Sequence, residues 1–350
     1  MRVLVVGASG NVGTSVLREL ADEPAVESVL GLCRRVPDLR FPKVEWRAAD
    51  VTSTPLAPLF QGADAVIHLA WLIQPGRDRS LTHRVNVFGS ERVFRAVAET
   101  SVPALVYASS VGAYAPGPKD RRVPETWPTT GVESSFYSRD KAAVERLLDR
   151  FERNSPALRV VRLRPGLIFS RDAASEIRRL FAGPLLPGGL LRPSLIPVVP
   201  RVERLVFQAL HSQDVARAYR LAVVGDASGA FNLAAEPVID SSRLEELLGA
   251  RGVPVSARVL RAAAAASFHL RLQPSEPGWL DMALAVPVMD TARARDQLGW
   301  SARQSSLEAL SELLEGMREG AGLDTPPLEP GGAGPLRLRE FLSGVGARLG

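Results

Sequence analysis

The stretch RVLVVGASGNVG, residues 2–13, joins a short apolar run to a turn that contains three glycines. The run is rich in β-branched valine and stops at Gly7, which is typical of a strand. After the turn, Val12, Val16 and Leu20 recur at the spacing of one helix face. The stretch therefore predicts a strand, a glycine turn and a helix, in that order.

The glycine turn follows the pattern GxxGxxG. Glycines at this point let the chain turn tightly, bring backbone N–H groups close to a pyrophosphate and let the helix pack near the sheet. Because the pattern lies between a predicted strand and a predicted helix, it favours dinucleotide binding over a plain structural turn. The residues that we expect to contact the cofactor here are Gly7, Ser9, Gly10, Asn11, Val12 and Gly13.

Further short apolar runs alternate with helical spacing along the chain. Strands that alternate with helices are typical of an α/β fold with a parallel sheet. We therefore predict a Rossmann-type, doubly wound parallel sheet with a smaller, mostly C-terminal substrate lobe. The expected strands are 2–8, 27–33, 43–49, 64–70, 103–110, 158–164 and 230–234, and the expected helices include 80–99, 136–152, 213–224, 241–250, 291–298 and 305–318.

The pattern changes after Pro165, and residues 183–200 contain too much proline and glycine for a regular element. We expect this loop-rich segment to lie over a ligand site or between two lobes. A chain of 350 residues is also long enough for its core to divide. The predicted divisions are a dinucleotide-binding domain at 1–170, to which 205–235 returns, a substrate-binding lobe at 171–204 and 236–320, and a flexible tail at 321–350.

The composition is that of a folded protein from a reducing compartment. Hydrophobic residues make up 46% of the chain and charged residues 23%, close to globular averages. Cys33 is the only cysteine, which excludes an internal disulfide framework and a cysteine-rich zinc site. No segment approaches the roughly 18 apolar residues of a membrane span, and the N-terminus lacks a signal-peptide core. We expect a cytoplasmic protein with no membrane partner.

The net charge of +5 and the pI near 9.8 raise the question of nucleic acid. Arginine is interleaved with Asp and Glu, and no block of five like charges occurs. We therefore expect a solvated surface and no nucleic-acid partner, although the excess charge can serve an anionic ligand. We also expect no metal, because the histidines lack metal-ligand spacing; they are His68, His83, His211 and His269.

The end of the second predicted strand bears on the choice of dinucleotide. NAD-binding sites usually place an acidic residue about 20 residues beyond the glycines, where it bonds the ribose 2′-hydroxyl. Here Cys33 is followed by Arg34 and Arg35, and two guanidinium groups suit a 2′-phosphate. We therefore favour NADP(H) over NAD(H); the alternative is that both arginines only solvate the loop. Asp50 and Val51 end the third strand, where we expect the adenine.

A tyrosine and a lysine stand out in SSFYSRDKAAVERLL, residues 134–148. The chain has only three lysines among its 43 basic residues, and Lys141 lies four residues after Tyr137 on one face of a predicted helix. An ammonium near a phenol favours the phenolate and lowers a pKa that is normally about 10. The pair therefore predicts a tyrosine that exchanges protons near neutral pH. The alternative is an ordinary exposed helix pair.

Several motifs occur in a recognisable order. They are GASGNVG at 7–13, ADV at 49–51, HLA at 68–70, NVFGSERVFRA at 86–96, YASSVGAY at 107–114, YSRDK at 137–141, RLRPGLIF at 162–169 and DQLGW at 296–300. In this order the sequence resembles the extended short-chain dehydrogenase/reductase family, in its NAD-dependent epimerase/dehydratase branch. The resemblance covers roughly residues 1–320 and implies a nicotinamide cofactor on a Rossmann-type fold.

The resemblance also implies roles for individual residues. Ser110 would be the catalytic hydroxyl, because it lies four residues before Tyr114, and Ser109 is its rival. Tyr137 would exchange a proton with a substrate oxygen that Ser110 holds, while Lys141 would bind the nicotinamide ribose. The cofactor contacts implied in this way are Leu69, Ala70, Asn86, Tyr137, Lys141 and Pro165.

The family contains epimerases, dehydratases and simple reductases, and the sequence leaves the first and the last open. Dehydration is disfavoured because Val111 and Gly112, rather than an acidic residue, follow the catalytic serine. The loop at 183–200 is mostly apolar, which suits a hydrophobic or small carbonyl substrate at least as well as a sugar nucleotide. Arg201 and Arg204 could still bind a diphosphate.

Two further expectations concern turnover and assembly. The alternative to an enzyme is a regulatory protein that senses NADPH without turnover, and the combination of Ser110, Tyr137 and Lys141 favours the enzyme. The resemblance suggests a possible homodimer through the helices near 80–99 and 136–152, although those faces could equally be core.

Overall fold

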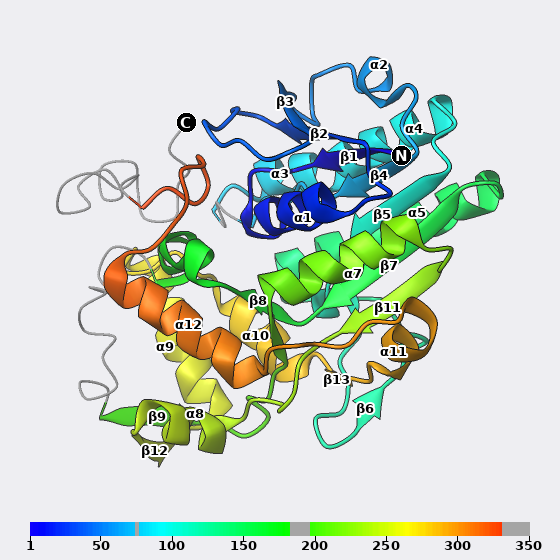
Figure 1. Cartoon of the computed structure of the whole chain (residues 1–350). Helices are drawn as coiled ribbons and strands as arrows, with labels where there is room; N and C mark the ends of the chain where they lie inside the picture. Colours follow the sequence, from blue (N-terminus) through cyan, green and yellow to red (C-terminus); the bar gives the residue numbers. More distant parts are fainter. Residues whose placement is uncertain (74–76, 183–196, 331–350) are drawn as a thin grey trace.

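The centre of the protein is a seven-stranded parallel sheet with the strand order β11-β7-β5-β4-β1-β2-β3 (Figure 1). The computed structural model describes residues 1–73, 77–182 and 197–330. The strand order reverses between β1 and β4, and sheets of this kind bind ligands beyond the carboxyl ends of the strands at such a reversal. The strands are β1 (Arg2–Val6), β2 (Ser28–Cys33), β3 (Val44–Ala48), β4 (Ala65–His68), β5 (Ala104–Ala108), β7 (Arg159–Pro165) and β11 (Gly229–Leu233).

The central strands of this sheet are buried on both faces, which explains why they read as short apolar runs. Successive side chains of β1 point to opposite faces, so that Val3 and Val5 join one core cluster and Leu4 and Val6 the other. All four side chains are almost completely buried. The predicted α/β class and the doubly wound parallel sheet are confirmed.

Helices cover both faces of the sheet (Figure 1). On one face α1 (Asn11–Asp22) packs against α7 (Ser212–Val224). On the other, α4 (Gly89–Glu99) and α5 (Phe136–Asn154) bury side chains such as Leu148. These buried faces belong to the core, so only the outer faces of α4 and α5 are available for the possible homodimer, which stays a prediction. Shorter helices on this side are α2 (Ala57–Phe60), α3 (Arg79–His83) and η1 (Arg84–Phe88).

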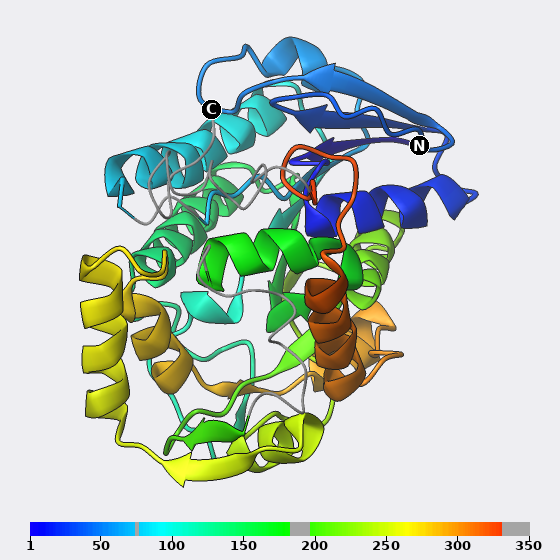
Figure 2. The same ribbon diagram turned by 90° about the vertical axis from the view of Figure 1, so that its left-hand side faces the viewer.

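A smaller lobe contains most of the chain after β7, and Figure 2 shows its helices below the sheet. Its strands form short parallel pairs, β8 with β10, β9 with β12 and β6 with β13. The strands are β6 (Arg122–Val123), β8 (Leu167–Phe169), β9 (Val198–Arg201), β10 (Ala209–His211), β12 (Arg251–Pro254) and β13 (Val288–Met289), and the helices are η3 (Arg171–Ala173), α6 (Ala174–Ile177), η4 (Arg178–Ala182), α8 (Ser241–Leu248), α9 (Ala257–His269), α10 (Pro277–Ala285) and α12 (Ser306–Glu319). The helix α11 (Ala292–Leu298) packs instead against α7 and β11 of the central sheet.

The helices α9 and α10 were not predicted from the sequence. The alanine-rich α9 has no buried residue, so no periodic apolar stripe marks it. In the part of the chain that the structure describes, no helix combines the length and the apolar character needed to cross a membrane.

Residues 321–330 begin the segment that we expected to be a flexible tail, but they pack against the protein. The Ser175 hydroxyl donates a hydrogen bond to the Ala321 carbonyl at 2.7 Å, and Leu328 is fully buried. The proline- and glycine-rich composition predicted a linker, whereas one buried leucine and this bond hold the segment in place. The rest of the predicted tail, and most of the loop at 183–200, lie outside the described residues.

Candidate active site

The glycine turn after β1 brings the chain into close contact with the end of β4. Gly7 has a φ of +91°, and a Cβ atom there would lie 2.6 Å from the backbone nitrogen of Ala70. A Cβ atom on Gly13 would lie 2.5 Å from the carbonyl oxygen of Ala8. At Gly10, in contrast, a Cβ atom would meet only one carbonyl oxygen, at 3.8 Å. Packing therefore requires two of the glycines, and the third leaves space beside the turn.

That space lies at the N-terminus of α1, whose first N–H groups have no partner inside the helix and attract anions. Gly10 is the N-cap residue and offers no side chain to these groups, and the first turn contains no acidic residue. Asn11 accepts a hydrogen bond from the Ser170 hydroxyl at 2.8 Å. Ser9 bonds to Cys33, and burial raises the pKa of that thiol to about 11. The turn and the helix end fit the pyrophosphate of a dinucleotide.

Arg34 and Arg35 are exposed and directly follow β2. Asp50, after β3, takes two hydrogen bonds from Thr52, at 2.7 and 2.6 Å. Burial would raise the pKa of Asp50, but the Thr52 bonds and the charges of Arg34 and Arg92 lower it. The sequence interpretation counted no carboxylate near the arginines, because Asp50 is remote from them along the chain. The structure places this carboxylate near enough to Arg34 for the two opposite charges to attract each other.

The remaining predicted cofactor contacts lie near the ends of the strands. Leu69 and Ala70 follow β4 and are partly buried, and Val12 packs against the core. Asn86 is fully buried, and its amide accepts from the Leu72 N–H at 2.7 Å and donates to the Leu72 carbonyl at 2.9 Å. Asn86 therefore holds the chain after β4 in position. Two further predicted contacts are buried at strand ends: Val51 and Pro165.

A hydrogen-bonded cap fixes the first turn of α5 against the segment that follows β5. Ser135 is the N-cap residue and accepts a hydrogen bond from the Ser138 N–H. The Ser138 hydroxyl is fully buried; it donates to the Gly112 carbonyl at 2.5 Å and accepts from the Val132 N–H at 2.6 Å. Tyr137, which lies on this turn, therefore faces the residues after β5.

Ser110 and Tyr137 meet through their hydroxyl groups. Ser110 is buried and accepts a hydrogen bond from the Gly112 N–H at 3.0 Å, which caps η2 (Val111–Ala113). The Ser110 hydroxyl also interacts with the Tyr137 phenol and acts to lower the pKa of that phenol. Gly112 is required because a Cβ atom there would lie 2.8 Å from Cε1 of Tyr137. The rival Ser109 is bonded instead to a buried carboxylate on α5.

Lys141 lies on the same face of α5 and is almost completely buried. Its ammonium donates to the Ala108 carbonyl at 2.7 Å, and Nζ lies 3.5 Å from the ring centroid of Trp71. The Tyr137 ring centroid is 5.8 Å from the same Nζ. The indole N–H of Trp71 is buried and has no hydrogen-bond partner among the described residues. Trp71 therefore covers the ammonium that was expected to bind the nicotinamide ribose.

Burial controls the protonation of both groups. It raises the pKa of Tyr137 to about 12, although the bond with Ser110 lowers that pKa in part. It also lowers the pKa of Lys141 well below its usual range, against the opposing charges of Glu145 and Asp140. The expected fall of the Tyr137 pKa toward neutrality is not found: burial raises this pKa, and the group that acts to lower it is Ser110. Tyr137 is a protonated donor across the neutral pH range.

Aromatic side chains from three parts of the chain surround Tyr137. The ring centroids of Tyr137 and Trp279, on α10, are 4.8 Å apart, and those of Trp279 and Phe181 are 5.1 Å apart. Trp71 meets the Tyr137 ring edge to face, with 5.9 Å between centroids. The indole N–H of Trp279, like that of Trp71, is buried without a partner in the described part of the chain. On this side the Tyr137 ring is therefore covered by aromatic rings, and the polar groups near it are the two indole N–H groups, Ser110 and Lys141.

The two arginines that could have bound a diphosphate are engaged elsewhere. Arg201 forms two hydrogen bonds with the Glu245 carboxylate, at 3.0 and 2.7 Å. Arg204 donates to the backbone carbonyls of Leu284 and Gly117, at 3.3 and 2.9 Å. A carboxylate already neutralises Arg201, and Arg204 stabilises the end of α10. This engagement weakens the argument for a sugar nucleotide.

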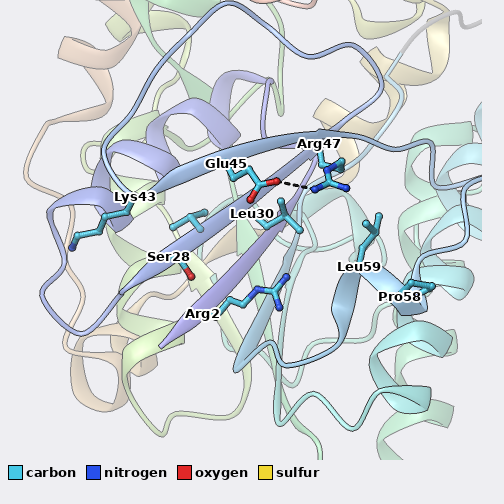
Figure 3. A pocket seen from close by; sticks show the side chains of 9 residues that line it. Arg2, Ser28, Leu30, Lys43, Glu45, Arg47, Pro58 and Leu59 are labelled. Carbon is cyan, nitrogen blue, oxygen red and sulfur yellow. Dashed lines mark hydrogen bonds and ion pairs between the residues drawn. The ribbon is translucent and has the colours of Figure 1, made fainter.

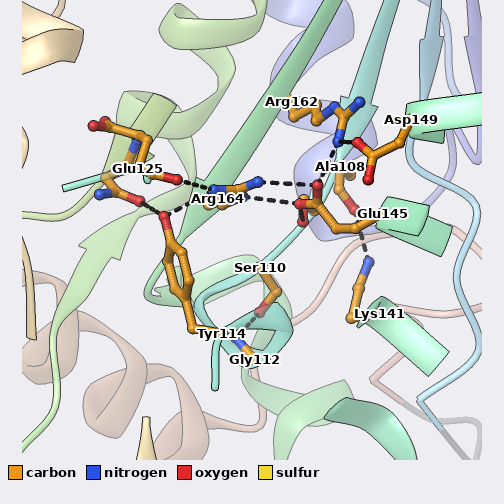
Figure 4. Close-up of polar contacts among 12 residues, drawn as sticks. Ala108, Ser110, Gly112, Tyr114, Glu125, Lys141, Glu145, Asp149, Arg162 and Arg164 are labelled. Atoms are coloured by element: carbon orange, nitrogen blue, oxygen red, sulfur yellow. Dashed lines mark hydrogen bonds and ion pairs between the residues drawn. The ribbon is translucent and has the colours of Figure 1, made fainter. Parts of the chain in front are cut away.

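The sequence interpretation missed the charged groups that lie behind the serines. Glu145 is fully buried and pairs with two arginines of β7, Arg162 and Arg164 (Figure 4). Glu145 lies four residues after Lys141 and therefore on the same helix face as Tyr137 and Lys141. The same spacing rule that selected Tyr137 and Lys141 would have selected Glu145 as well. No comparable signal marks the arginines, since this chain uses arginine throughout.

Histidines do not form a site here. No group of three or more His, Cys, Asp or Glu side chains in the described ranges is placed to hold a metal ion. His68 is buried on β4 and hydrogen bonds with the Ser90 hydroxyl at 2.9 Å, and burial lowers the pKa of His68 to about 3. His83 pairs with Asp140 at 2.7 Å.

A separate hollow of about 210 Å³ lies near the amino ends of β1 and β2 (Figure 3). Its cations are Arg2, Lys43 and Arg47, and each is bonded to a carbonyl or carboxylate oxygen. The glycine turn lies at the other end of β1, so this hollow is not part of the candidate site.

The chain matches known proteins over most of its length. The model of the NAD dependent epimerase/dehydratase family matches residues 3–234. An uncharacterized protein of Mycobacterium tuberculosis is 28% identical over 326 residues, which cover 92% of this chain and 31% of that protein. Sterol-4-alpha-carboxylate 3-dehydrogenase, decarboxylating, of Candida albicans is 26% identical over 258 residues, which cover 71% of this chain and 68% of that enzyme. The solved structure of UDP-glucuronic acid 4-epimerase from Bacillus cereus in complex with NAD has a TM-score of 0.67 at 18% identity and covers 91% of this chain and 99% of that one.

The sheet and the glycine turn define a Rossmann-type α/β protein. Within that class, the chain belongs to the NAD dependent epimerase/dehydratase family, whose model matches well over half of its length. The family resemblance that the sequence motifs indicated is thereby confirmed. The chain spans about a third of the length of the Mycobacterium tuberculosis relative, and at 18% identity the solved epimerase shares the fold.

Proposed function

We propose that this protein is an NAD(P)-dependent oxidoreductase of the epimerase/dehydratase type. It would move a hydride between a nicotinamide and a carbinol or carbonyl carbon of an apolar, cyclic substrate. The observation that carries the proposal is the placement of Tyr137 against the serine turn, where a Cβ atom on Gly112 would lie 2.8 Å from its ring, and 5.8 Å from the ammonium of the buried Lys141. An ordinary exposed helix pair does not account for a lysine that is 3% exposed. Epimerisation uses the same hydride transfer twice, so this arrangement also suits an epimerase.

The proposed proton chemistry follows from the state of the phenol. Because its pKa is raised to about 12, Tyr137 is protonated at neutral pH and can donate to a carbonyl oxygen that becomes an alcohol. In the reverse direction the phenol first releases its proton to solvent, and the phenolate then accepts the hydroxyl proton of the substrate alcohol as the hydride leaves for the nicotinamide. Ser110 holds the same substrate oxygen through its hydroxyl. The nicotinamide, when bound, supplies or accepts the hydride.

We propose NADP(H) rather than NAD(H) as the cofactor, on the basis of Arg34 and Arg35 after β2. Asp50 reduces this preference, because its carboxylate attracts Arg34 and partly neutralises the charge that a 2′-phosphate would bind. For a ribose hydroxyl to reach Lys141, the Trp71 indole has to turn away, since 3.5 Å between Nζ and the ring centroid leaves no room for another group. Cofactor binding and a change at Trp71 are therefore coupled in this proposal.

The substrate class rests on the aromatic rings around the phenol. Trp71, Trp279 and Phe181 present flat apolar surfaces on which an uncharged ring system can pack. The similarity to a sterol dehydrogenase supports this choice. A diphosphate would need cationic partners, and Arg201 and Arg204 already have other ones.

A substrate panel tests the proposal. The purified protein is given NADP+ or NAD+ with alicyclic secondary alcohols, their ketones with the reduced cofactors, and UDP-sugars, and nicotinamide absorbance and products are followed. We expect turnover of alicyclic alcohols or ketones. Turnover of UDP-sugars alone would overturn the apolar substrate. Dinucleotide binding without turnover of any member would favour the NADPH-sensing regulator instead.

A further inference from the structure

The segment 109–114, SSVGAY, carries Ser110 from the end of β5 toward α5 and is called here the serine segment. The polar contacts of the Ser110 hydroxyl among the described residues are with Gly112, which lies within the segment, and with Tyr137. The position of Ser110 therefore depends on how the rest of the segment is held. The residues at the two ends of the serine segment, Ser109 and Tyr114, both bond to buried groups outside it.

The first end of the serine segment is bonded to α5. The Ser109 hydroxyl donates to Oε1 of Glu145 at 2.5 Å. Glu145 is fully buried and is held by Arg164, which donates from Nε at 2.8 Å and from Nη2 at 3.0 Å. Arg162 donates to the same carboxylate at 2.9 Å. These bonds hold the pKa of Glu145 at about 2 although burial acts to raise it, so the group is a carboxylate at any neutral pH.

The second end of the serine segment is bonded to β7 and β11. The Tyr114 phenol accepts a hydrogen bond from Nη1 of Arg164 at 3.0 Å and donates to Oδ1 of Asn232 at 2.6 Å. Tyr114 and Asn232 are fully buried, and Arg164 is 4% exposed. The remaining bond of Nη1 goes to the Glu125 carbonyl at 2.8 Å. Figure 4 shows Arg164 bonded to both Glu145 and Tyr114. Because Glu145 in turn accepts from Ser109, one guanidinium group serves both ends of the serine segment.

The planar guanidinium suits this task because its N–H groups point in fixed directions. Arg164 uses one edge for the carboxylate that holds Ser109 and another for the phenol of Tyr114. A shift of Arg164 would move both ends of the serine segment, and with them the hydroxyl that meets Tyr137. Buried polar groups without partners are costly, so the network has few alternative arrangements.

We propose that Arg164, acting through Glu145 and Tyr114, is a positioning residue that holds the Ser110 hydroxyl against the Tyr137 phenol. The proposal rests on the proposed function in one respect, namely that this contact matters for turnover. Removal of Arg164 itself would leave the buried carboxylate of Glu145 with Arg162 as its remaining cationic partner and endanger the fold. The test therefore uses Ser109→Ala and Tyr114→Phe, which each remove one hydroxyl and leave the ion pair of Arg164 and Glu145 intact.

The first measurement is hydrogen exchange at the Gly112 amide, which is bonded to the Ser110 hydroxyl. We expect about tenfold faster exchange in each single variant and a larger change in the double variant, because the opening of the serine segment requires less free energy. Tyr107→Phe is the matched control, since Tyr107 is a buried tyrosine whose hydroxyl has no partner among the described residues. We expect it to behave as the wild type.

The second measurement separates positioning from general stability. In Ser109→Ala and Tyr114→Phe we expect kcat to fall about ten- to a hundredfold, with the dinucleotide Kd unchanged, because a displaced hydroxyl affects only the reacting oxygen. Unchanged exchange at Gly112, or faster exchange with an unchanged kcat, would overturn the proposal. If the wild-type protein turned over no substrate, the proposed function would fail, and the exchange measurement would still decide whether Arg164 holds Ser110.

Discussion

The two halves of the candidate site are built from different groups. The cofactor half consists of the glycine turn at 7–13 and two exposed arginines, so it relies on backbone N–H groups and solvated charges. The half that we propose to be catalytic consists of Ser110, Tyr137 and Lys141; Ser110 and Lys141 are buried, and the Lys141 ammonium is bonded to the end of β5. Water can replace a lost contact in the first half but not in the second. We therefore expect graded losses of affinity in one and nearly complete losses of turnover in the other.

The largest effect is expected for Tyr137→Phe. It should lower kcat about a thousandfold, within the range that general acid–base catalysis contributes, because no other described hydroxyl shares its position against Ser110. Dinucleotide affinity, measured by calorimetric titration, should stay within about twofold, because the phenol moves a proton and does not hold the cofactor. Tyr107→Phe is the control for a buried phenol. Near-normal turnover in Tyr137→Phe would remove the basis for calling this half catalytic.

The next effect concerns Arg34 and Arg35. Replacing both by alanine should weaken NADP+ binding about ten- to a hundredfold and leave NAD+ binding almost unchanged, because a charge-assisted contact to the 2′-phosphate is lost. Asp50→Asn is the matched variant with the opposite expected effect on NADP+ affinity. It removes the carboxylate charge near Arg34 and should strengthen NADP+ binding a few-fold. Calorimetric titration with both cofactors measures this. Equal losses for the two cofactors would show that the arginines only face solvent.

A smaller effect is expected where the two halves meet, at Trp71. Trp71→Ala should tighten dinucleotide binding about tenfold, because the contact between the indole and the Lys141 ammonium no longer has to be broken. In the wild type, tryptophan fluorescence should change on dinucleotide binding, and Trp71→Phe should lose most of that change. Trp300→Phe, which removes a buried indole bonded to Asp214, should keep it. Weaker binding in Trp71→Ala would mean that the indole supports the cofactor.

The smallest effect is a gain in stability that we expect from Lys141→Met. Burial lowers the pKa of Lys141 in the folded protein below its unfolded value of about 10.4, so the unfolded chain binds more protons between the two values. Wild-type stability therefore rises with pH through this window. At pH near 7 the methionine variant should be more stable by about 1 kcal/mol, and its advantage should shrink toward pH 10. Urea unfolding at several pH values measures this, and a pH-independent difference would contradict it.

The sequence predicted most of what is local. The strand before Gly7, the helix after it and the spacing of Tyr137 and Lys141 are features of continuous stretches, and the sheet appeared where those stretches indicated. The helix α9 escaped prediction because its alanine-rich run has no buried face. Leu328 shows the opposite error, because a linker-like composition concealed one anchoring side chain.

The errors at the site have one cause, namely that contacts between distant residues, and the burial that these contacts produce, cannot be read from short stretches of sequence. Asp50 was not counted against Arg34 because the two residues follow different strands, β3 and β2. The Tyr137 pKa was expected to fall because the spacing of the two residues on a helix reveals the nearby ammonium. The spacing does not reveal that burial removes water from the phenol and raises its pKa. Trp71 was not expected over Lys141, since only the packing of β4 beside β5 brings them together.

By itself, the sequence determined that this chain folds as a Rossmann-type protein with a glycine turn for a dinucleotide and with a tyrosine and a lysine on one helix face. These properties follow from the periodicity of hydrophobic residues and from residue types at short spacing, because the geometry of a strand or a helix fixes which nearby side chains share a face. Only the tertiary structure decided that Ser110 rather than Ser109 meets Tyr137, that Trp71 covers Lys141 and that Arg164 serves both ends of the serine segment. These contacts join residues far apart in the chain, and their energies depend on burial, which no short stretch of sequence specifies.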